Sequence, residues 1–113
     1  MIEIIIKNYL AEKLSVPVVL EVPTDPPKNF VLLEKTGSSR EEHIDRAMLA
    51  IQSYAPSMYE AARLNERVKS AMDSAAELDA VSASRLNSDY NFTDTTTKRY
   101  RYQAVYDLVY FDK

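Results

Sequence analysis

The feature that most constrains the fold is the strict alternation of side chains in the last segment, TKRYRYQAVYDLVYFDK. Successive side chains of a β-strand point to opposite faces of a sheet, so this alternation predicts a long strand with two different faces. One face carries Tyr100, Tyr102, Ala104, Tyr106, Leu108 and Tyr110. The other face carries Arg99, Arg101, Gln103, Val105, Asp107, Val109 and Phe111. We expect helices to cover the tyrosine face, while the two arginines point outward.

The same segment permits another interpretation, because basic and aromatic side chains also interleave where proteins bind single-stranded nucleic acid. Bases would stack on Tyr100 and Tyr102 while Arg99 and Arg101 followed the phosphates. The alternation continues far beyond the basic residues, and the net charge of -3 gives no general attraction to a polyanion. Strand periodicity is therefore the preferred explanation, and we expect no specific nucleic acid partner.

Two segments have the periodicity of helices. In the first, apolar residues recur at steps of three and four from Ile2 to Leu14. The second begins at Ser57, which forms a capping-box pattern with Glu60, and its stripe of apolar residues extends to about Glu77.

The remaining segments indicate strands and connectors. We predict strands at 16–22, 30–35, 47–54 and 80–86, in addition to the last one. The proline-rich stretch PTDPPKN should be a stiff connector, since prolines cannot continue a ladder of hydrogen bonds. The polar run from Thr36 to Asp45 is predicted to be a long exposed hairpin loop.

These elements predict an α+β fold in the order α-β-β-β-α-β-β. The sheet should be mostly antiparallel, with both helices packed on one face. The length of 113 residues is that of one domain, so residues 1–113 are assigned to a single domain with one core.

The composition argues against an enzyme. There is no cysteine, and the single glycine, Gly37, cannot build the glycine-rich loops that cradle phosphates. The sole histidine, His43, lies beside Glu41, Glu42 and Asp45, but this stretch reads as a solvated loop without a scaffold for a metal or an acid/base pair. We expect no catalytic residues, no metal and no cofactor.

The opening stretch MIEIIIKNYL is apolar but is interrupted by Glu3 and Lys7. No small-residue cleavage site follows it, so it fits neither a signal peptide nor a membrane span. Together with the absence of cysteine, this predicts a protein that stays in the cytoplasm where it is made and has no membrane partner.

Three stretches carry a resemblance that covers nearly the whole chain. They are VPVVLEVPTDPPKNFVLLEKTGSS, DRAMLAIQSYAPSMYEAARLNERVKSAM and YNFTDTTTKRYRYQAVYDLVYF, in this order. Together they resemble the tail-terminator, or tail-completion, minor tail proteins of long-tailed phages and prophages of Gram-positive bacteria. Each stretch is a structural pattern, so the resemblance rests on their order and spacing.

The resemblance implies a small α+β virion protein at the head-proximal end of the tail. Such a protein closes into a ring, commonly a hexamer, on the tail tube, stops its polymerisation and presents a surface to the head. Its partners would be further copies of itself, the major tail tube protein and the head–tail connector protein. A neck or head-completion protein that binds the connector is the close alternative, and the sequence does not separate the two.

Two polar regions are the predicted contact sites for these partners. The first is the run that contains Arg40, Glu41, Glu42, His43 and Arg46, which we expect to reach a neighbouring subunit or the tail tube, or to order only on assembly. The second lies between Asp89 and Arg101. There Asp94, Arg99 and Arg101 are candidates for ion pairs across a subunit boundary.

Overall fold

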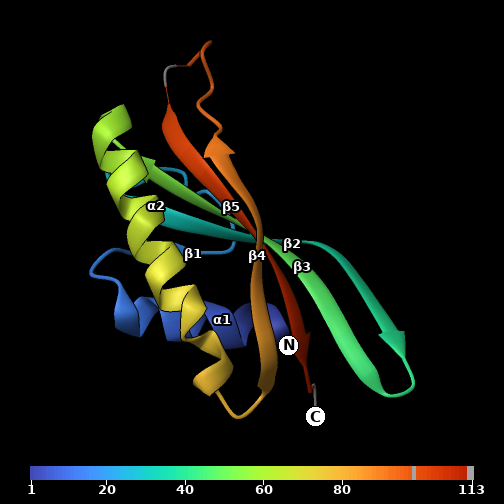
Figure 1. Ribbon diagram of the computed structural model, residues 1–113. Coiled ribbons are helices and arrows are strands. Elements are labelled where there is room, and N and C mark those ends of the chain that lie inside the picture. The colour runs from blue at the N-terminus through green and yellow to red at the C-terminus, as the bar shows by residue number, and fades with distance from the viewer. Residues whose placement is uncertain (98, 112–113) are drawn as a thin grey trace.

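The computed structural model describes residues 1–97 and 99–111 and confirms the predicted α+β fold and its element order (Figure 1). Two α-helices and a short 3-10 helix, η1, accompany five strands. The helices are α1 (Ile2–Lys13), α2 (Met58–Asp73) and η1 (Ala75–Glu77). The strands are β1 (Val18–Val19), β2 (Phe30–Glu41), β3 (Ile44–Ala55), β4 (Val81–Asn91) and β5 (Tyr100–Tyr110).

All five strands form one sheet in the order β1-β2-β3-β5-β4. Only the short β1–β2 pair is parallel, and the other three pairs are antiparallel. The sheet is mostly antiparallel, as predicted. Strand β5 therefore lies inside the sheet, between β3 and β4, although it is the last element of the chain.

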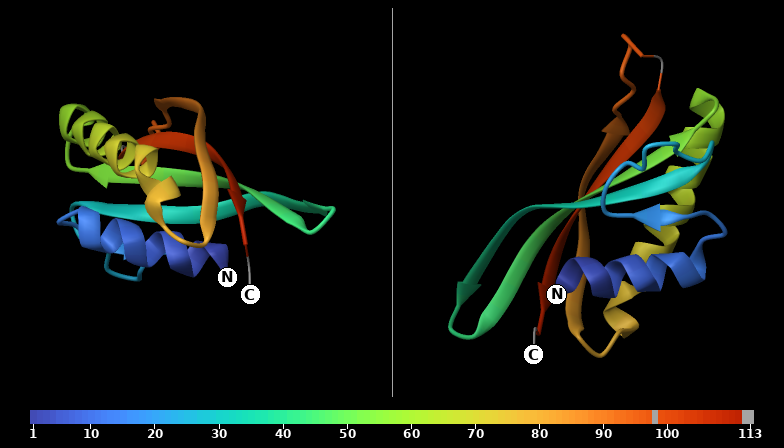
Figure 2. Two further views of the ribbon diagram at one scale, coloured as in Figure 1. Left: turned by 60° about the horizontal axis from the view of Figure 1, so that its bottom comes forward. Right: turned by 180° about the vertical axis from the view of Figure 1, so that it is seen from behind.

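The two helices cover the same face of the sheet, which also confirms the prediction. Figure 2 shows α2 crossing the twisted sheet, with α1 beside it near β1 and β2. The Tyr9 hydroxyl on α1 donates a hydrogen bond of 2.7 Å to the carbonyl of Ala71 on α2. One apolar cluster joins both helices to the alternate residues of β2, β3 and β5 that face them. It includes Ile6, Leu10, Val31, Leu49, Ile51, Val68, Met72, Ala104, Tyr106 and Leu108.

The register explains how the alternation of β5 builds this core. Tyr106 lies opposite Leu49, and Ala104 lies opposite Ile51. Directly opposed residues of neighbouring strands share a face, so the buried sets of β3 and β5 stack beneath the helices. The predicted assignment of the tyrosines to the covered face is correct.

Helix α2 begins as its capping signal predicts. The Ser57 side-chain oxygen accepts a hydrogen bond of 3.2 Å from the backbone N–H of Glu60. The Ser57 hydroxyl in turn donates to the Glu60 carboxylate at 3.0 Å. The α-helix ends at Asp73, and the predicted continuation to Glu77 is the separate 3-10 turn η1.

The prediction of a long loop from Thr36 to Asp45 is wrong. Strand β2 continues to Glu41 and β3 begins at Ile44, so only Glu42 and His43 form the turn. Both have positive φ angles, 52° and 68°, which is the geometry of a tight hairpin turn whose twist matches its strands. The polar composition does not reveal the strand, because β2 is the edge of the sheet over this stretch and both of its faces are exposed while it pairs with β3.

Three strand boundaries also differ from the prediction. The strand expected at 16–22 is only Val18–Val19, because Pro17 lacks an N–H and β1 meets only Val31 and Leu32. Strand β4 is longer than the expected 80–86 because it pairs with β5 as far as Asn91. Strand β3 starts before the expected Ala47, because Asp45 already pairs with Tyr110.

We predict a sharp contrast between two neighbouring positions of β3. Leu49→Ala should lower the free energy of unfolding by about 2–5 kcal/mol, since Leu49 is fully buried and its removal leaves a cavity. Met48→Ala should cost about 0.5 kcal/mol or less, because Met48 is 39% exposed on the opposite face. Urea unfolding followed by circular dichroism measures both, and equal losses would contradict the assigned faces.

Candidate interaction surface

The sheet face that points away from the helices is the main candidate for an interaction surface, and we call it the outer face. No helix in the described part of the chain covers it. Its central positions come from β3 and β5, in the register of that pair. They are Arg46, Met48, Ala50, Gln52, Tyr54, Arg101, Gln103, Val105, Asp107 and Val109.

A continuous polar network crosses one half of the outer face. The Tyr54 hydroxyl donates to the Gln52 amide oxygen at 2.9 Å, and the Gln52 amide nitrogen donates to Gln103 at 2.9 Å. Gln103 in turn donates to the Tyr90 hydroxyl at 2.6 Å. The network links β3, β5 and β4. Gln52, Tyr54 and Gln103 are buried, so these hydrogen bonds satisfy polar groups that have little contact with solvent.

Arg101 is the cation of this network. Its guanidinium donates to the Tyr54 hydroxyl at 2.7 Å and to the Phe92 carbonyl at 2.6 Å. The Arg101 guanidinium also lies 4.5 Å from the centre of the Phe92 ring. The rings of Tyr54 and Phe30 stack, with 4.4 Å between their centres. Arg101 is thus held within its own subunit, and the position predicted for an intersubunit ion pair also has a structural role.

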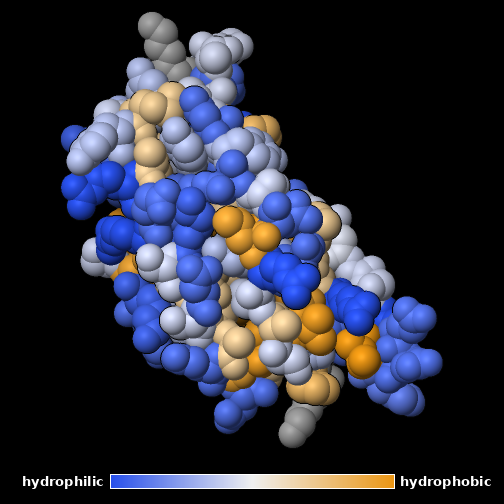
Figure 3. Space-filling model, viewed as in Figure 1, coloured by the Kyte–Doolittle hydropathy of each residue, from blue (hydrophilic) through white to orange (hydrophobic). Residues whose placement is uncertain are grey.

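A groove occupies the other half of the outer face. It has a volume of about 710 Å³ and lies between the start of the β2–β3 hairpin and strands β4 and β5. Met48 and Val109 contribute apolar surface, while Arg46 and Arg85 contribute charge. Figure 3 shows hydrophobic and strongly hydrophilic surface side by side in the lower half of that view.

The predicted hairpin residues fall at the far end of the molecule. Arg40 and Asp45 face each other across the hairpin and form an ion pair, with a second hydrogen bond of 3.2 Å between Nη2 and Oδ2. Glu41, Glu42 and His43 lie beyond this pair and are exposed. The hairpin is therefore a paired ribbon with an acidic tip. Arg46 points elsewhere, into the groove of the outer face.

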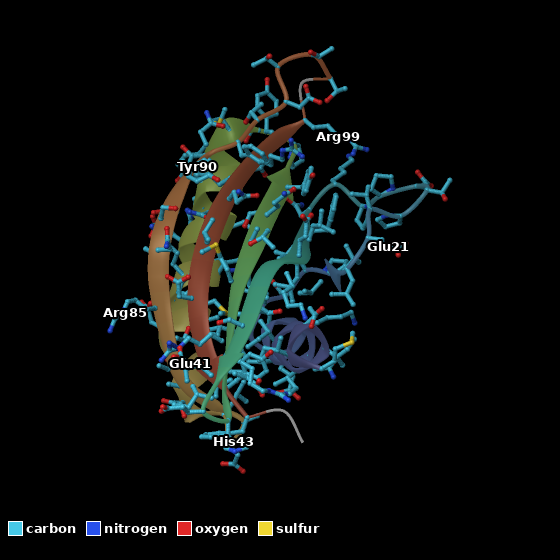
Figure 4. All side chains as sticks on the ribbon, turned by 90° about the vertical axis from the view of Figure 1, so that its right-hand side faces the viewer. Glu21, Glu41, His43, Arg85, Tyr90 and Arg99 are labelled. Carbon is cyan, nitrogen blue, oxygen red and sulfur yellow. The ribbon has the colours of Figure 1, made fainter. Side chains whose placement is uncertain are left out.

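The second group of predicted residues lies at the opposite end, as the positions of Arg99, Glu41 and His43 in Figure 4 show. Backbone pairing joins Asp94 to Arg99 across a turn. The Asp94 carboxylate accepts the backbone N–H of Thr96 at 3.0 Å. A hydrogen bond from the Thr97 side chain, followed by the backbone N–H groups of Thr96 and Thr97, lowers the pKa of Asp94. The predicted residues at the hairpin thus lie at one end of the molecule and Asp94 and Arg99 at the other, while Arg46 lines the groove and Arg101 belongs to the polar network of the outer face.

The geometry of β5 also concerns the alternative interpretation, in which this strand binds single-stranded nucleic acid. Arg101 pairs with Tyr54 on the outer face, whereas Tyr102 pairs with Ser53 and lies on the helix-covered face. The neighbouring basic and aromatic side chains therefore do not share one surface. No structural observation adds support to this alternative.

Sequence reasoning did not identify a polar cluster between α2 and β4. Lys69 donates to Asp89 at 3.0 Å, and Asp89 also accepts from the Asn65 amide at 2.9 Å. The hydrogen bond that Lys69 donates to Asp89 is the main cause that raises the pKa of Lys69. Burial raises the pKa of the adjacent Tyr106 phenol. Asn65 and Lys69 lie on α2 and Asp89 lies on β4, so no local sequence motif indicates the cluster. The cluster holds α2 against β4.

Two other kinds of feature are absent from residues 1–97 and 99–111. No group of three or more histidine, aspartate or glutamate side chains there could hold a metal ion. Within the same ranges, no helix has the length and apolar character needed to cross a membrane. A comparison with protein-family models and with curated proteins gave no match to this chain.

We predict that the two candidate arginines behave differently. Arg101→Ala should lower the free energy of unfolding by about 1–3 kcal/mol, because it removes hydrogen bonds to Tyr54 and Phe92. Arg99→Ala should change it by about 0.5 kcal/mol or less, since Arg99 is exposed. Chemical unfolding of the two variants makes the comparison, and an equally large loss in both would contradict the role given to Arg101.

The Asp94 turn should depend on pH. Because the pKa of Asp94 is lowered from 3.8 in the folded state, its contribution to stability is present above pH 3.8 and is lost as the pH falls through the folded value. An NMR titration of its carboxyl carbon should give a midpoint below 3.8. Thr97→Val should move that midpoint toward 3.8 by removing the hydroxyl donor. A midpoint at or above 3.8 in the unmodified protein would contradict this account.

Proposed function

We propose that this chain is a structural virion protein of a long-tailed phage or prophage, a tail terminator that forms a ring on the tail tube. In this role it stops polymerisation of the tube and provides the surface for head–tail joining. Its partners are further copies of itself in a ring, the major tail tube protein and the head–tail connector protein. It is made in the bacterial host cytoplasm and acts at the head-proximal end of the tail.

The observation that best supports this proposal is the exposed part of the outer face around its groove, where Arg46, Met48 and Arg85 are accessible. A sheet face without a helical cover normally packs against something, and this one combines apolar side chains with arginines and a prearranged polar network. Arginine and tyrosine are enriched among the residues that dominate protein–protein binding energy. The outer face thus has the composition of a protein interface. An assembly protein of this kind requires neither a metal nor a cofactor.

The outline of the molecule also suits a ring. The chain is elongated, 44 Å by 25 Å by 25 Å. Its β2–β3 hairpin projects on the side opposite the C-terminal end of α1 (Figures 1 and 2). A ring requires two different patches that meet around a rotation axis. A projection on one side and a receptive surface on the other are what such a contact needs.

A neck or head-completion protein would use similar surfaces, so the partner decides between the two. A tail terminator should retain the major tail tube protein in a pull-down, whereas a neck protein should retain only the connector. Retention of the connector alone would replace the leading proposal with this alternative.

Deletion of the gene from its parent phage or prophage should yield overlong or headless tails, because nothing would stop the tube or join it to a head. Electron microscopy of the particles measures tail length and head attachment. Tails of normal length joined to heads would reject the proposed function.

Complementation can connect this phenotype to the outer face. A Met48→Glu copy should fail to restore normal tails, since it places a charge in the groove of that face. Thr24→Glu, which adds the same charge at an exposed position in the connector before β2, should restore them. Equal rescue by both copies would remove the outer face from the proposal.

A further inference from the structure

A second groove lies on the helical side of the molecule, between α1 and the middle of α2. It has a volume of about 530 Å³. Three exposed cations line it, Lys13 from α1 and both Arg63 and Arg67 from α2. We call it the basic groove.

The positive charge of the basic groove is largely uncompensated. Arg63 donates to the Tyr59 hydroxyl at 3.2 Å, and Arg67 donates to the Ser15 hydroxyl at 3.1 Å. Lys13 lies 5.7 Å from the centre of the Tyr9 ring. Within the described ranges, none of these three cations forms an ion pair with a carboxylate.

Glu66, the acidic side chain that lines the groove, does not neutralise its positive charge. Glu66 pairs with Lys69 at 3.0 Å, so a further cation already compensates it. The neutral contacts of Arg63 and Arg67 fix the directions of their guanidinium groups and leave most of their donors available. Because a guanidinium is a planar fork that matches a carboxylate, the groove is suited to a ligand with two carboxylates.

This chain itself presents such a ligand, which we call the hairpin tip and define as Glu41, Glu42 and His43. Both carboxylates are exposed at the end of the β2–β3 ribbon. The turn is tight, with positive φ at Glu42 and His43, and the Arg40–Asp45 pair closes the ribbon directly behind it. The tip is therefore arranged before binding, which reduces the entropy lost on contact.

The hairpin tip cannot reach the basic groove of its own chain. Every view in Figures 1 and 2 places the tip on one side of the molecule and the C-terminal end of α1 on the other. We propose that the basic groove of one copy receives the hairpin tip of a second copy. This inference rests on the proposed ring-forming function and names a contact that would join neighbouring subunits.

A second copy fits better than a nucleic acid as the occupant. The net charge of -3 repels a long polyanion, and the three cations of the basic groove form a short patch between two helices, not an extended track. The hairpin tip places only two carboxylates in that groove. A nucleic acid would also place its phosphates against the rest of the surface, which is negatively charged overall. Joining tip to groove is also a heterologous contact, as ring closure requires.

The absence of cysteine permits a direct test by disulfide cross-linking. Glu42→Cys and Arg67→Cys are made as separate variants, mixed at equal concentration and oxidised. Intact mass spectrometry then separates the mixed dimer from the two self-dimers. Because a specific contact raises the local thiol concentration, the mixed dimer should exceed each self-dimer by about tenfold. Dimers in the proportions of random collision would overturn the proposal.

Charge reversal shows whether electrostatics drives the contact. Adding Glu41→Arg to the Glu42→Cys chain should reduce the mixed dimer by about tenfold, the effect of losing one charge-assisted contact. Adding Arg63→Glu to the Arg67→Cys chain should then restore it. Glu21→Arg is the matched control, because it makes the same change of charge at an exposed position away from the hairpin tip (Figure 4). An equal reduction by this control would reject the specific contact.

The cross-link and the deletion phenotype can fail independently. Random cross-linking together with overlong tails would reject this contact and leave the proposed function standing. A specific cross-link together with normal tails would establish self-association through the basic groove and reject the tail function. Far-ultraviolet circular dichroism of each variant ensures that a lost cross-link is not a loss of folding, and a misfolded cysteine variant is replaced by Glu41→Cys or Arg63→Cys.

Discussion

The rest of the structure depends on the burial of one face of β5 beneath the two helices. The strand lies between β3 and β4, and its residues Tyr106 and Leu108 are almost completely buried. Burying a large apolar side chain contributes about 1.5–3 kcal/mol, so these alternate positions supply much of the force that holds helices and sheet together. The Tyr106 hydroxyl also reaches the Lys69 carbonyl of α2 at 3.4 Å, which gives this buried polar atom a partner.

This arrangement has a direct consequence for the outer face. Gln52, Tyr54 and Gln103 are buried on the outer face, so their polar groups need partners within the sheet. The chain from Arg101 through Tyr54 and Gln52 to Gln103 provides these partners with side chains from two neighbouring strands. The same contacts hold the Arg101 guanidinium against the rings of Tyr54 and Phe92.

Much of the fold could be predicted because its signals are local. The alternation along β5 identified the buried tyrosines, and the Ser57–Glu60 pattern identified the start of α2. The prediction of a loop from Thr36 to Asp45 is wrong because a polar composition does not distinguish an exposed edge strand from irregular structure. In the folded chain, the Arg40–Asp45 ion pair and the pairing of β3 with β5 extend those strands to the tip. The two polar regions predicted from the sequence are distinct in the structure, but Arg40 and Glu41 lie on a paired strand and not on a loop, and Arg46 and Arg101 have contacts that the sequence did not indicate.

The sequence by itself determined which face of β5 is buried and where α2 begins, because periodicity and capping act over a few neighbouring residues. Only the tertiary structure decided which distant side chains meet. Lys13 comes from α1 and Arg63 from α2, yet both line one groove, while the acidic hairpin tip lies on the opposite side of the molecule. Such juxtapositions depend on the order of strands in the sheet and on the packing of the helices. Both result from burial summed over the whole chain, which no local pattern records.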